Sequence, residues 1–353
     1  MKRKSIILIA VVVVLGVVAA LLLHRYNRPS TFKQDYNVAD TAAVTRVFMS
    51  DKQDNCVLLS RNSQKGGQWL VDNSYAASQP MIDLLLETLN SMRIREQVNR
   101  AAVPNVIKAL SSRSTMVEVY QKRYAINWFG GRVRLFARER LAVTYFVGHE
   151  TQDLMGSYVY REGDKVPYII HIPGFRGFLG PRFVADPIVW RSHSIVNLNV
   201  RQIAEVRLEI PAEPAESFAI RSEGDGFAMY MLGSGQRVDG FDTARVAQLL
   251  ASFVNLNFDE YAVAVPQVEL DTTFARQPRT ILTVTDTGGR SCELRTYIKY
   301  TNPNDLLAMP DPEMYDVFDL NRLYAIIDKT DTVLIQYYVF DNILQPASYF
   351  SRR

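Results

Sequence analysis

Cysteine and histidine are scarce in this sequence of 353 residues, which contains two cysteines and four histidines. Cys56 and Cys292 are far apart, so they form neither a metal motif nor a disulfide framework, although one long-range disulfide in an oxidising compartment stays open. The histidines, at positions 24, 149, 171 and 193, are isolated. His149-Glu150 begins like a zinc-protease helix, but Asp153 stands where the second histidine is needed. We therefore expect no metal site and no cofactor.

A strong charge of one sign is also missing. Lysine and arginine number 40 against 37 acidic residues, a net charge of +3, which is too small to indicate a nucleic-acid partner. The sequence has no phosphate-binding glycine loop, and Gly233-Ser234-Gly235 lacks the spacing of a nucleophile elbow. These absences predict a protein that is not an enzyme, with no catalytic residue to name.

The N-terminus carries a long apolar run. Residues 6–23 follow Lys2, Arg3 and Lys4 without interruption by a charge. As a helix these positions span roughly 27 Å, close to the hydrocarbon core of a bilayer. The run is longer than the apolar region of a signal peptide, and no small-residue cleavage site follows Leu23. We expect an uncleaved transmembrane anchor at 6–23 behind a short cytoplasmic segment at 1–5, with a linker at 24–36.

The orientation of the anchor depends on a small charge difference. Three basic residues precede the run, while Arg25, Arg28 and Lys33 follow it. A short basic N-terminus retained in the cytoplasm is the better fit to the positive-inside rule. The expected location is therefore the inner membrane, with a single pass and with the bulk of the chain periplasmic or otherwise extracytoplasmic.

The body is predicted to be one α+β unit written twice, at 37–186 and 187–353, with mainly antiparallel sheets. Val44–Met49 and Ile203–Leu208 alternate apolar and polar residues as half-buried strands do. Each is followed by two more strands and by a helix with an apolar stripe, near 82–92 and 246–256. Later segments also match in order, including Tyr168–Ile170 with Tyr324–Ile327. Strands grouped around helices, rather than alternating with them, favour antiparallel sheets.

One segment without a counterpart runs from Gln121 to Arg140. It reads as a hairpin that turns at Gly130-Gly131, a pair that tolerates positive φ. Basic residues dominate it, and aromatic residues lie among them; the candidate binding residues are Trp128, Arg132 and Arg134. Such a segment can meet anionic lipid headgroups or an acidic partner. The alternative is a solvated hairpin that merely extends the sheet.

A second such segment is the glycine-rich stretch Pro173–Phe183. Phe175 and Phe178 call for burial, while Arg176 and Arg182 offer forked donors to a carboxylate or phosphate. These four residues are therefore candidates for binding an anionic ligand. The alternative is a structural loop whose phenylalanines, Phe183 included, pin the body together.

Residues Trp190–Leu198, with Trp69, Ala102-Val103-Pro104 and the Pro173–Phe183 stretch, resemble the uncharacterised bacterial family DUF4340, above all its membrane-anchored Bacteroidetes form. Members of that family often accompany auxiliary, gliding-motility-type subunits of ABC transporters. The resemblance implies an envelope accessory role and a partner in an ABC-type transport complex. It supplies no catalytic residue.

Together these features favour a membrane-anchored, non-catalytic binding or scaffold protein of the cell envelope. Two alternatives stay open. An envelope hydrolase or carbohydrate-active enzyme needs acids or a nucleophile that converge in a cleft. A sensor of an anionic ligand needs the arginines of the glycine-rich stretch to be free for binding.

Overall fold

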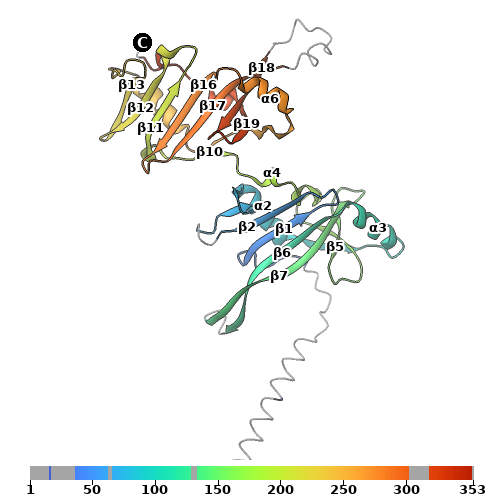
Figure 1. Ribbon diagram of the computed structural model, residues 1–353. Coiled ribbons are helices and arrows are strands. Elements are labelled where there is room, and N and C mark those ends of the chain that lie inside the picture. The colour runs from blue at the N-terminus through green and yellow to red at the C-terminus, as the bar shows by residue number, and fades with distance from the viewer. Residues whose placement is uncertain (1–15, 17–35, 63–65, 129–132, 302–317, 352–353) are drawn as a thin grey trace, which may run out of the picture. The chain divides into compact units, whose positions relative to one another are not determined.

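The computed structural model describes residue 16 and residues 36–62, 66–128, 133–301 and 318–351 (Figure 1). The chain forms two compact units that divide between Arg191 and Ser192, whereas the boundary predicted from the sequence is at 186/187. The predicted anchor and linker lie outside the described residues, apart from Gly16 and Tyr36. Across the described ranges, no helix has both the length and the apolar character needed to cross a bilayer.

Unit 1 is built on one antiparallel sheet, whose strands follow the order β4-β3-β2-β1-β6-β7-β8-β9-β5. Its strands are β1 (Val44–Ser50), β2 (Cys56–Arg61), β3 (Trp69–Val71), β4 (Tyr75–Ala76), β5 (Arg93–Gln97), β6 (Thr115–Trp128), β7 (Val133–Glu150), β8 (Ser157–Arg161) and β9 (Tyr168–His171). Its helices are α2 (Gln79–Ser91), α3 (Val103–Arg113) and the short α4 (Pro187–Trp190), together with a 3-10 turn at Gly180–Arg182.

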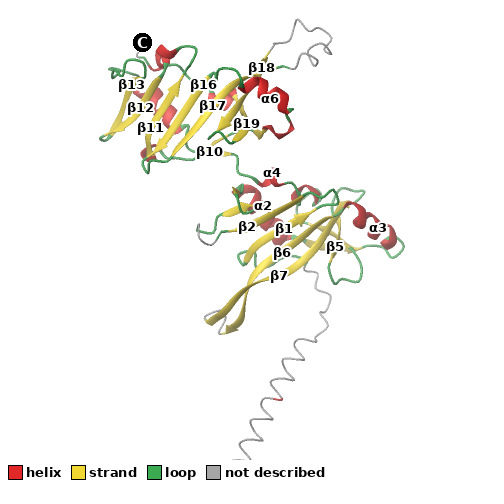
Figure 2. Cartoon of the chain, viewed as in Figure 1, coloured by secondary structure: helices red, strands yellow, loops and turns green. Residues whose placement is uncertain are grey.

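Unit 2 is built on a second antiparallel sheet, of order β13-β12-β11-β16-β17-β18-β19-β15, with β10 and β14 paired separately. Its strands are β10 (Ser194–Val196), β11 (Ile203–Glu209), β12 (Phe218–Glu223), β13 (Gly226–Met231), β14 (Leu256–Asn257), β15 (Glu260–Tyr261), β16 (Thr280–Asp286), β17 (Ser291–Tyr300), β18 (Phe318–Ile327) and β19 (Asp331–Gln336). Its helices are α5 (Thr243–Ala251), α6 (Gln267–Phe274) and α8 (Tyr337–Phe340). The prediction of mainly antiparallel sheets is thus confirmed, and a few helices accompany them (Figure 2).

With β4 set aside, the two strand orders correspond place by place. The first strands also share a detail, since the pairing of β1 with β6 shifts register between Val44 and Arg46, and that of β11 with β16 between Ile203 and Glu205. One sequence correspondence is wrong. Tyr168–His171 forms β9, which holds the place of β19, whereas Tyr324 lies in β18.

A helix covers each face of the sheet in unit 1. Ile82, Leu85 and Leu89 of α2, spaced three and four residues apart, are at most 1% exposed and pack on the sheet face that carries Val159 and Ile170. Because neighbouring strand residues point to opposite faces, Tyr158, Tyr160 and Ile169 point the other way. They pack around Val106 and Leu110 of α3. The sheet is therefore sandwiched between α2 and α3.

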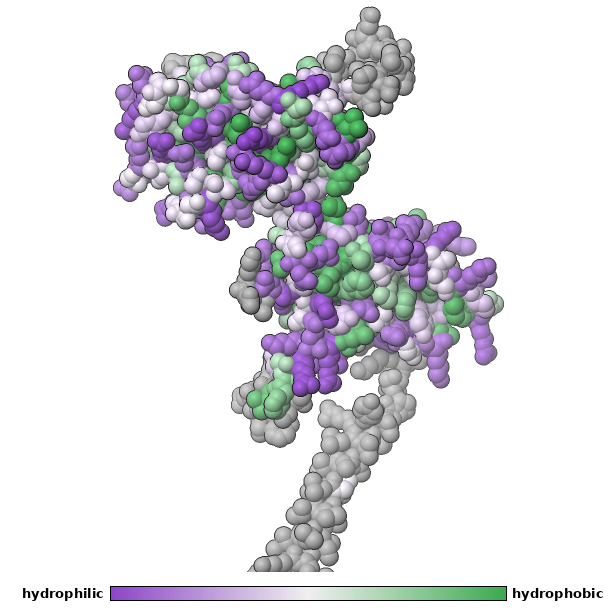
Figure 3. Space-filling model, in the orientation of Figure 1, coloured by the Kyte–Doolittle hydropathy of each residue, from purple (hydrophilic) through white to green (hydrophobic). Residues whose placement is uncertain are grey.

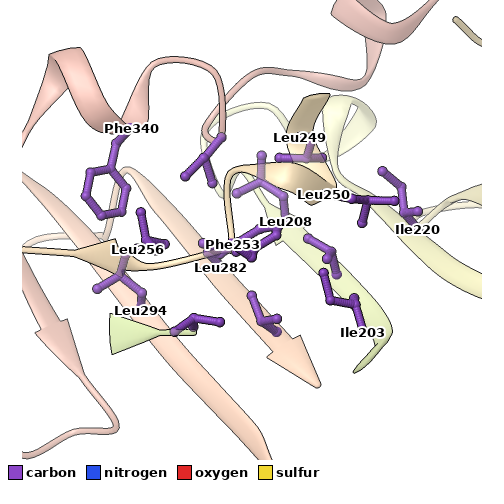
Figure 4. Packing of buried hydrophobic residues seen from close by; sticks show 14 of the residues in the cluster. Ile203, Leu208, Ile220, Leu249, Leu250, Phe253, Leu256, Leu282, Leu294 and Phe340 are labelled. Atoms are coloured by element: carbon purple, nitrogen blue, oxygen red, sulfur yellow. The ribbon is translucent and has the colours of Figure 1, made fainter. Parts of the chain in front are cut away.

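Unit 2 has the same layering. Val246, Leu249 and Leu250 of α5 are buried with strand residues such as Leu208 and Leu282, as Figure 4 shows. Leu270 of α6 belongs to a separate cluster with Tyr297, Tyr324 and Leu334. Asp242 begins α5 by accepting hydrogen bonds from the backbone N–H groups of Ala244 and Arg245, which have no partner within the helix. The apolar stripes predicted from the sequence are thus core-facing in both units.

The chain enters and leaves the two units through matching hydrogen bonds. Near the start, the Val38 N–H donates to Leu89 O at 2.8 Å in unit 1, and the Leu198 N–H donates to Phe253 O at 3.0 Å in unit 2. Near the end of unit 1, the Trp190 carbonyl accepts from the N–H of Ser78, the residue before α2, at 2.8 Å. Near the end of unit 2, the Phe350 carbonyl accepts from the N–H of Asp242, the residue before α5, at 2.7 Å. Each last segment therefore docks against the start of the helix in its own unit.

Candidate functional site

The clearest difference between the two units is the connection after their central strands. In unit 2, β16 pairs with β11 as far as Asp286, and the chain then turns through residues 287–290 into β17. In unit 1, β6 pairs with β1 as far as Gln121, but β6 and β7 continue together to Trp128 and Val133. We call residues 122–128 and 133–140 the arm; residues 129–132, with the predicted Arg132, lie outside the described residues and are not counted in it.

The arm is a continuation of two sheet strands (Figure 1). The predicted hairpin therefore extends the sheet, which agrees with either of the roles predicted for the segment. Trp128 lies in β6 opposite Val133, and Arg134 lies in β7 opposite Asn127. The register brings these two predicted residues to the outer part of the arm.

The arm exposes apolar side chains to solvent. Leu135 is 49% exposed and Phe136 68% exposed. The backbone of Phe136 has φ 57°, a left-handed conformation that a bulky residue rarely adopts. Packing supplies no reason for an aromatic residue to be strained and exposed at once, and such outliers gather at functional positions. Figure 3 shows apolar surface at the described end of the arm, next to strongly hydrophilic surface at its base.

The two faces of the arm differ in charge. The pairs Arg123–Arg138 and Gln121–Arg140 share one face because their strand positions alternate with those of Tyr124–Ala137. On the other face, the only acid of this part, Glu139, is already engaged: it lies 2.9 Å from Arg46 and accepts from the Thr45 hydroxyl at 2.6 Å. The charges of the arm itself that are left facing solvent are therefore cationic, whereas the neighbouring body exposes the acids Asp40 and Glu162.

A polar cavity of about 630 Å³ lies at the base of the arm. The Gln121 amide donates across it to Asp40 O at 2.8 Å. The hydroxyl of Thr144, which is 5% exposed, has no hydrogen-bond partner in the described part of the chain. Arg161, on another wall, ion-pairs with Asp164 and lies 4.6 Å from the centre of the Tyr36 ring. Burial, reinforced by Asp164, raises the pKa of the Tyr36 phenol far above its ordinary value.

The glycine-rich stretch Pro173–Phe183 packs into unit 1 after β9. Leu179 and Phe183 are each 1% exposed. Arg182 donates to the Thr88 hydroxyl at 3.0 Å and lies 4.4 Å from the centre of the Phe175 ring. Arg176 is exposed, whereas Phe175 and Phe178 are partly buried. The four predicted ligand residues therefore divide into an arginine and two phenylalanines engaged with the fold and one exposed arginine.

Sequence reasoning missed a cavity of about 410 Å³ in unit 2, next to the end of α6. Two arginines line it. Arg276 lies 4.3 Å from the centre of the Tyr300 ring, and Arg279 donates to the Tyr337 hydroxyl at 2.9 Å. The signal for it is the sequence Arg276-Gln277-Pro278-Arg279 after a helix. Both guanidinium groups lie near aromatic rings, that of Arg279 at 5.5 Å from the centre of the Tyr337 ring, so the cavity lining combines two arginines with the acid Glu213.

Within the described ranges, no three His, Cys, Asp or Glu side chains gather where a metal ion would bind. Both cysteines are free: Cys56 is exposed and Cys292 partly buried. The chain matches no family model, no curated protein and no solved structure. The resemblance to DUF4340 stays a prediction.

Proposed function

We propose that this chain is a non-catalytic binding or scaffold protein of the cell envelope, held to the inner membrane by residues 6–23 with its body outside the cytoplasm. The observation that carries the proposal is the arm. Unit 2 closes the same position with residues 287–290, so the fold does not need the additional chain. What the arm displays instead is exposed apolar and cationic surface, the composition of a contact element.

We also propose that the two units arose by duplication, because the comparison between them is then a comparison of two copies of one fold. Support comes from the matching strand orders and from the register shift at the same place in β1 and β11. Further support comes from the paired bonds Val38–Leu89 and Leu198–Phe253. Two units that solve the same packing problem make each one a control for the other. An element found in only one of them serves something other than packing.

The partner follows from the resemblance to DUF4340, which implies an accessory subunit of an ABC-type transport complex. An envelope accessory of this kind needs a fixed position at the membrane and a surface left open for the complex. The anchor and the arm supply the first, and the rest of the body supplies the second.

The test is to purify the full-length chain from its own membranes in mild detergent, with crosslinking and mass spectrometry. The matched variant replaces residues 122–139 by Thr-Gly-Gly, the turn sequence that precedes Arg290 in unit 2. The control variant carries Val268→Ser on α6, where the side chain is 78% exposed and distant in sequence from the arm.

When the proteins are crosslinked in the membrane before detergent is added, we expect the natural chain and the control variant to recover the same membrane proteins. The shortened variant should recover less of them, because its body has lost one of the contacts that position it, while it melts at a similar temperature. Repeated recovery of the natural chain alone, even after crosslinking, would overturn the proposal.

A further inference from the structure

We propose that the arm lies on the anionic surface of the same bilayer that holds the anchor, so that the body is attached at two points. The inference deepens the proposed function and rests on the anchor at 6–23. Its steps are the position of the arm's root, the reach of the linker, and the chemistry of the arm's side chains.

The root of the arm lies beside the place where the chain enters unit 1. The Lys122 N–H donates to Ala43 O at 2.8 Å, and the Gln121 amide donates to Asp40 O at the same distance. Tyr36 is the first residue of the body, four positions before Asp40. The linker and the arm therefore leave the body from neighbouring points.

The reach of the linker keeps this part of the body near the membrane. Thirteen residues, 24–36, span at most roughly 45 Å when fully extended. From Gln121 to Trp128 the arm advances seven strand positions, roughly 23 Å. An arm that begins next to the linker thus covers about half of the largest separation that the linker allows.

The chemistry of the arm matches an anionic lipid surface. Lys122, Arg123, Arg138 and Arg140 lie near its base, and the one acid of the arm, Glu139, is paired with Arg46. The cations outnumber the two exposed acids of the adjoining body, Asp40 and Glu162. Each cation close to an anionic leaflet raises membrane affinity by roughly fivefold. The exposed Leu135 and Phe136 add apolar surface that the headgroup region can cover. A protein partner would need its own acidic, apolar groove, whereas the bilayer is already brought within reach by the chain itself.

The test uses the full-length chain in lipid vesicles with a fluorescent label on the arm. Arg123→Cys, in a Cys56→Ser background, puts a polarity-sensitive dye on an exposed position of the face that carries Arg138 and Arg140, and leaves Leu135 and Phe136 in place. Cys292 does not compete for the label because its thiol is partly buried. The matched control carries the dye at Val268→Cys, which is 78% exposed in unit 2.

In vesicles that contain phosphatidylglycerol, we expect the dye at 123 to shift to the blue and to be quenched by spin-labelled lipid. Vesicles of phosphatidylcholine alone, or molar salt, should weaken both signals. Arg138→Gln with Arg140→Gln should lower the ratio of lipid-bound to free arm by roughly 25-fold, two factors of five. The dye at 268 should respond to neither lipid nor salt.

A dye at 123 that stays in water in both kinds of vesicle, while the chain remains embedded, would overturn the lipid contact and leave the proposed function standing. Release of the whole chain from membranes by alkaline carbonate would instead show that residues 6–23 do not span the bilayer, and this would overturn the proposed function as well. A blue shift of the dye that occurs only in native membranes, together with a crosslink from the arm to a protein, would show that the arm contacts a protein partner. That result would also overturn the inference.

Discussion

Arg182 joins the segment after β9 to the buried face of α2, because its Nη1 donates to the hydroxyl of Thr88 at 3.0 Å. Thr88 is fully buried, and its hydroxyl donates in turn to Leu84 O at 2.6 Å. The guanidinium also covers the Phe175 ring. The same short stretch holds a second arginine, Arg176, which is exposed. The two residues form a natural pair for separating a structural role from a binding role.

Arg182→Ala is expected to destabilise the chain by about 1–2 kcal/mol, because it removes a charged donor from a buried hydroxyl and uncovers Phe175. Arg176→Ala is expected to change the free energy of unfolding by less than about 0.5 kcal/mol, as exposed positions usually do. Urea unfolding of the three proteins measures both values.

The same pair decides the prediction of an anionic-ligand sensor. Equal stability of the two variants, together with loss of binding of phosphate or a carboxylate in both, would favour the sensor. Loss of stability in Arg182→Ala alone means that the stretch is structural.

Gly148→Ala tests the packing of α3 on β7. A Cβ at position 148 would lie 2.5 Å from Leu110 Cδ2 and 3.1 Å from Tyr158 O. The backbone oxygen cannot move as a side chain can, so we expect a loss of about 1–3 kcal/mol, typical of overpacking. Gly226→Ala, also in a strand, meets no atom within 4 Å and serves as the control. Thermal melting of both variants provides the comparison, and equal melting temperatures would contradict the α3 packing.

The two cysteines are expected to differ in reactivity. Burial, with Asp328 adding to it, raises the pKa of the Cys292 thiol to about 12. Because the thiolate is the reactive form, Cys292 should react with a thiol reagent very slowly at neutral pH, while the exposed Cys56 reacts at once. Titration should give one fast thiol per folded chain and two per unfolded chain. In Cys56→Ser the fast phase should vanish; if it persists, Cys292 is more accessible than the structure shows.

Asp286 should give unit 2 a stability that is lost in acid. Its carboxylate accepts from the N–H groups of Arg290 (2.9 Å) and Gly288 (2.8 Å), and these bonds with the Arg290 guanidinium lower its pKa below the ordinary 3.8. A lowered folded-state pKa means that the contribution is present above the unfolded-state value and disappears as the pH falls through the folded-state value.

The measurement is the melting temperature of the natural chain and of Asp286→Asn as a function of pH. The gap between them should be widest near neutral pH and should close below pH 3.8, where the natural carboxyl becomes protonated. A gap that stays constant into strong acid would mean that the charge of Asp286 is not what holds the turn.

The sequence predicts the elements whose pattern is local. The stripe through Ile82, Leu85 and Leu89 has a single solution, a helix with one buried face, and α2 follows it. The alternation in Val44–Met49 likewise gives β1. What failed is the assignment of Tyr168–Ile170 to the counterpart of Tyr324–Ile327, because short apolar strands look alike and only their neighbours in the sheet distinguish β9 from β18.

The candidate site shows the same limit. Gly130-Gly131 predicts a hairpin, but whether its strands stand apart or continue the sheet depends on pairing over a distance, which composition does not encode. Similarly, Arg176 and Arg182 look equivalent in sequence. They differ because only Arg182 meets Thr88, a residue that lies far away along the chain. The cavity beside Arg276 and Arg279 was missed since its walls come from segments separated by many residues.

The way the chain enters unit 1 has a mechanical consequence. Any force on the linker reaches the body at Tyr36, whose ring is completely buried and whose carbonyl accepts from the Tyr145 hydroxyl at 2.6 Å. Two residues later the Val38 N–H is bonded to the end of α2. A pull on the chain ahead of Tyr36 must therefore extract an aromatic ring from the core before it can separate any strand of the sheet.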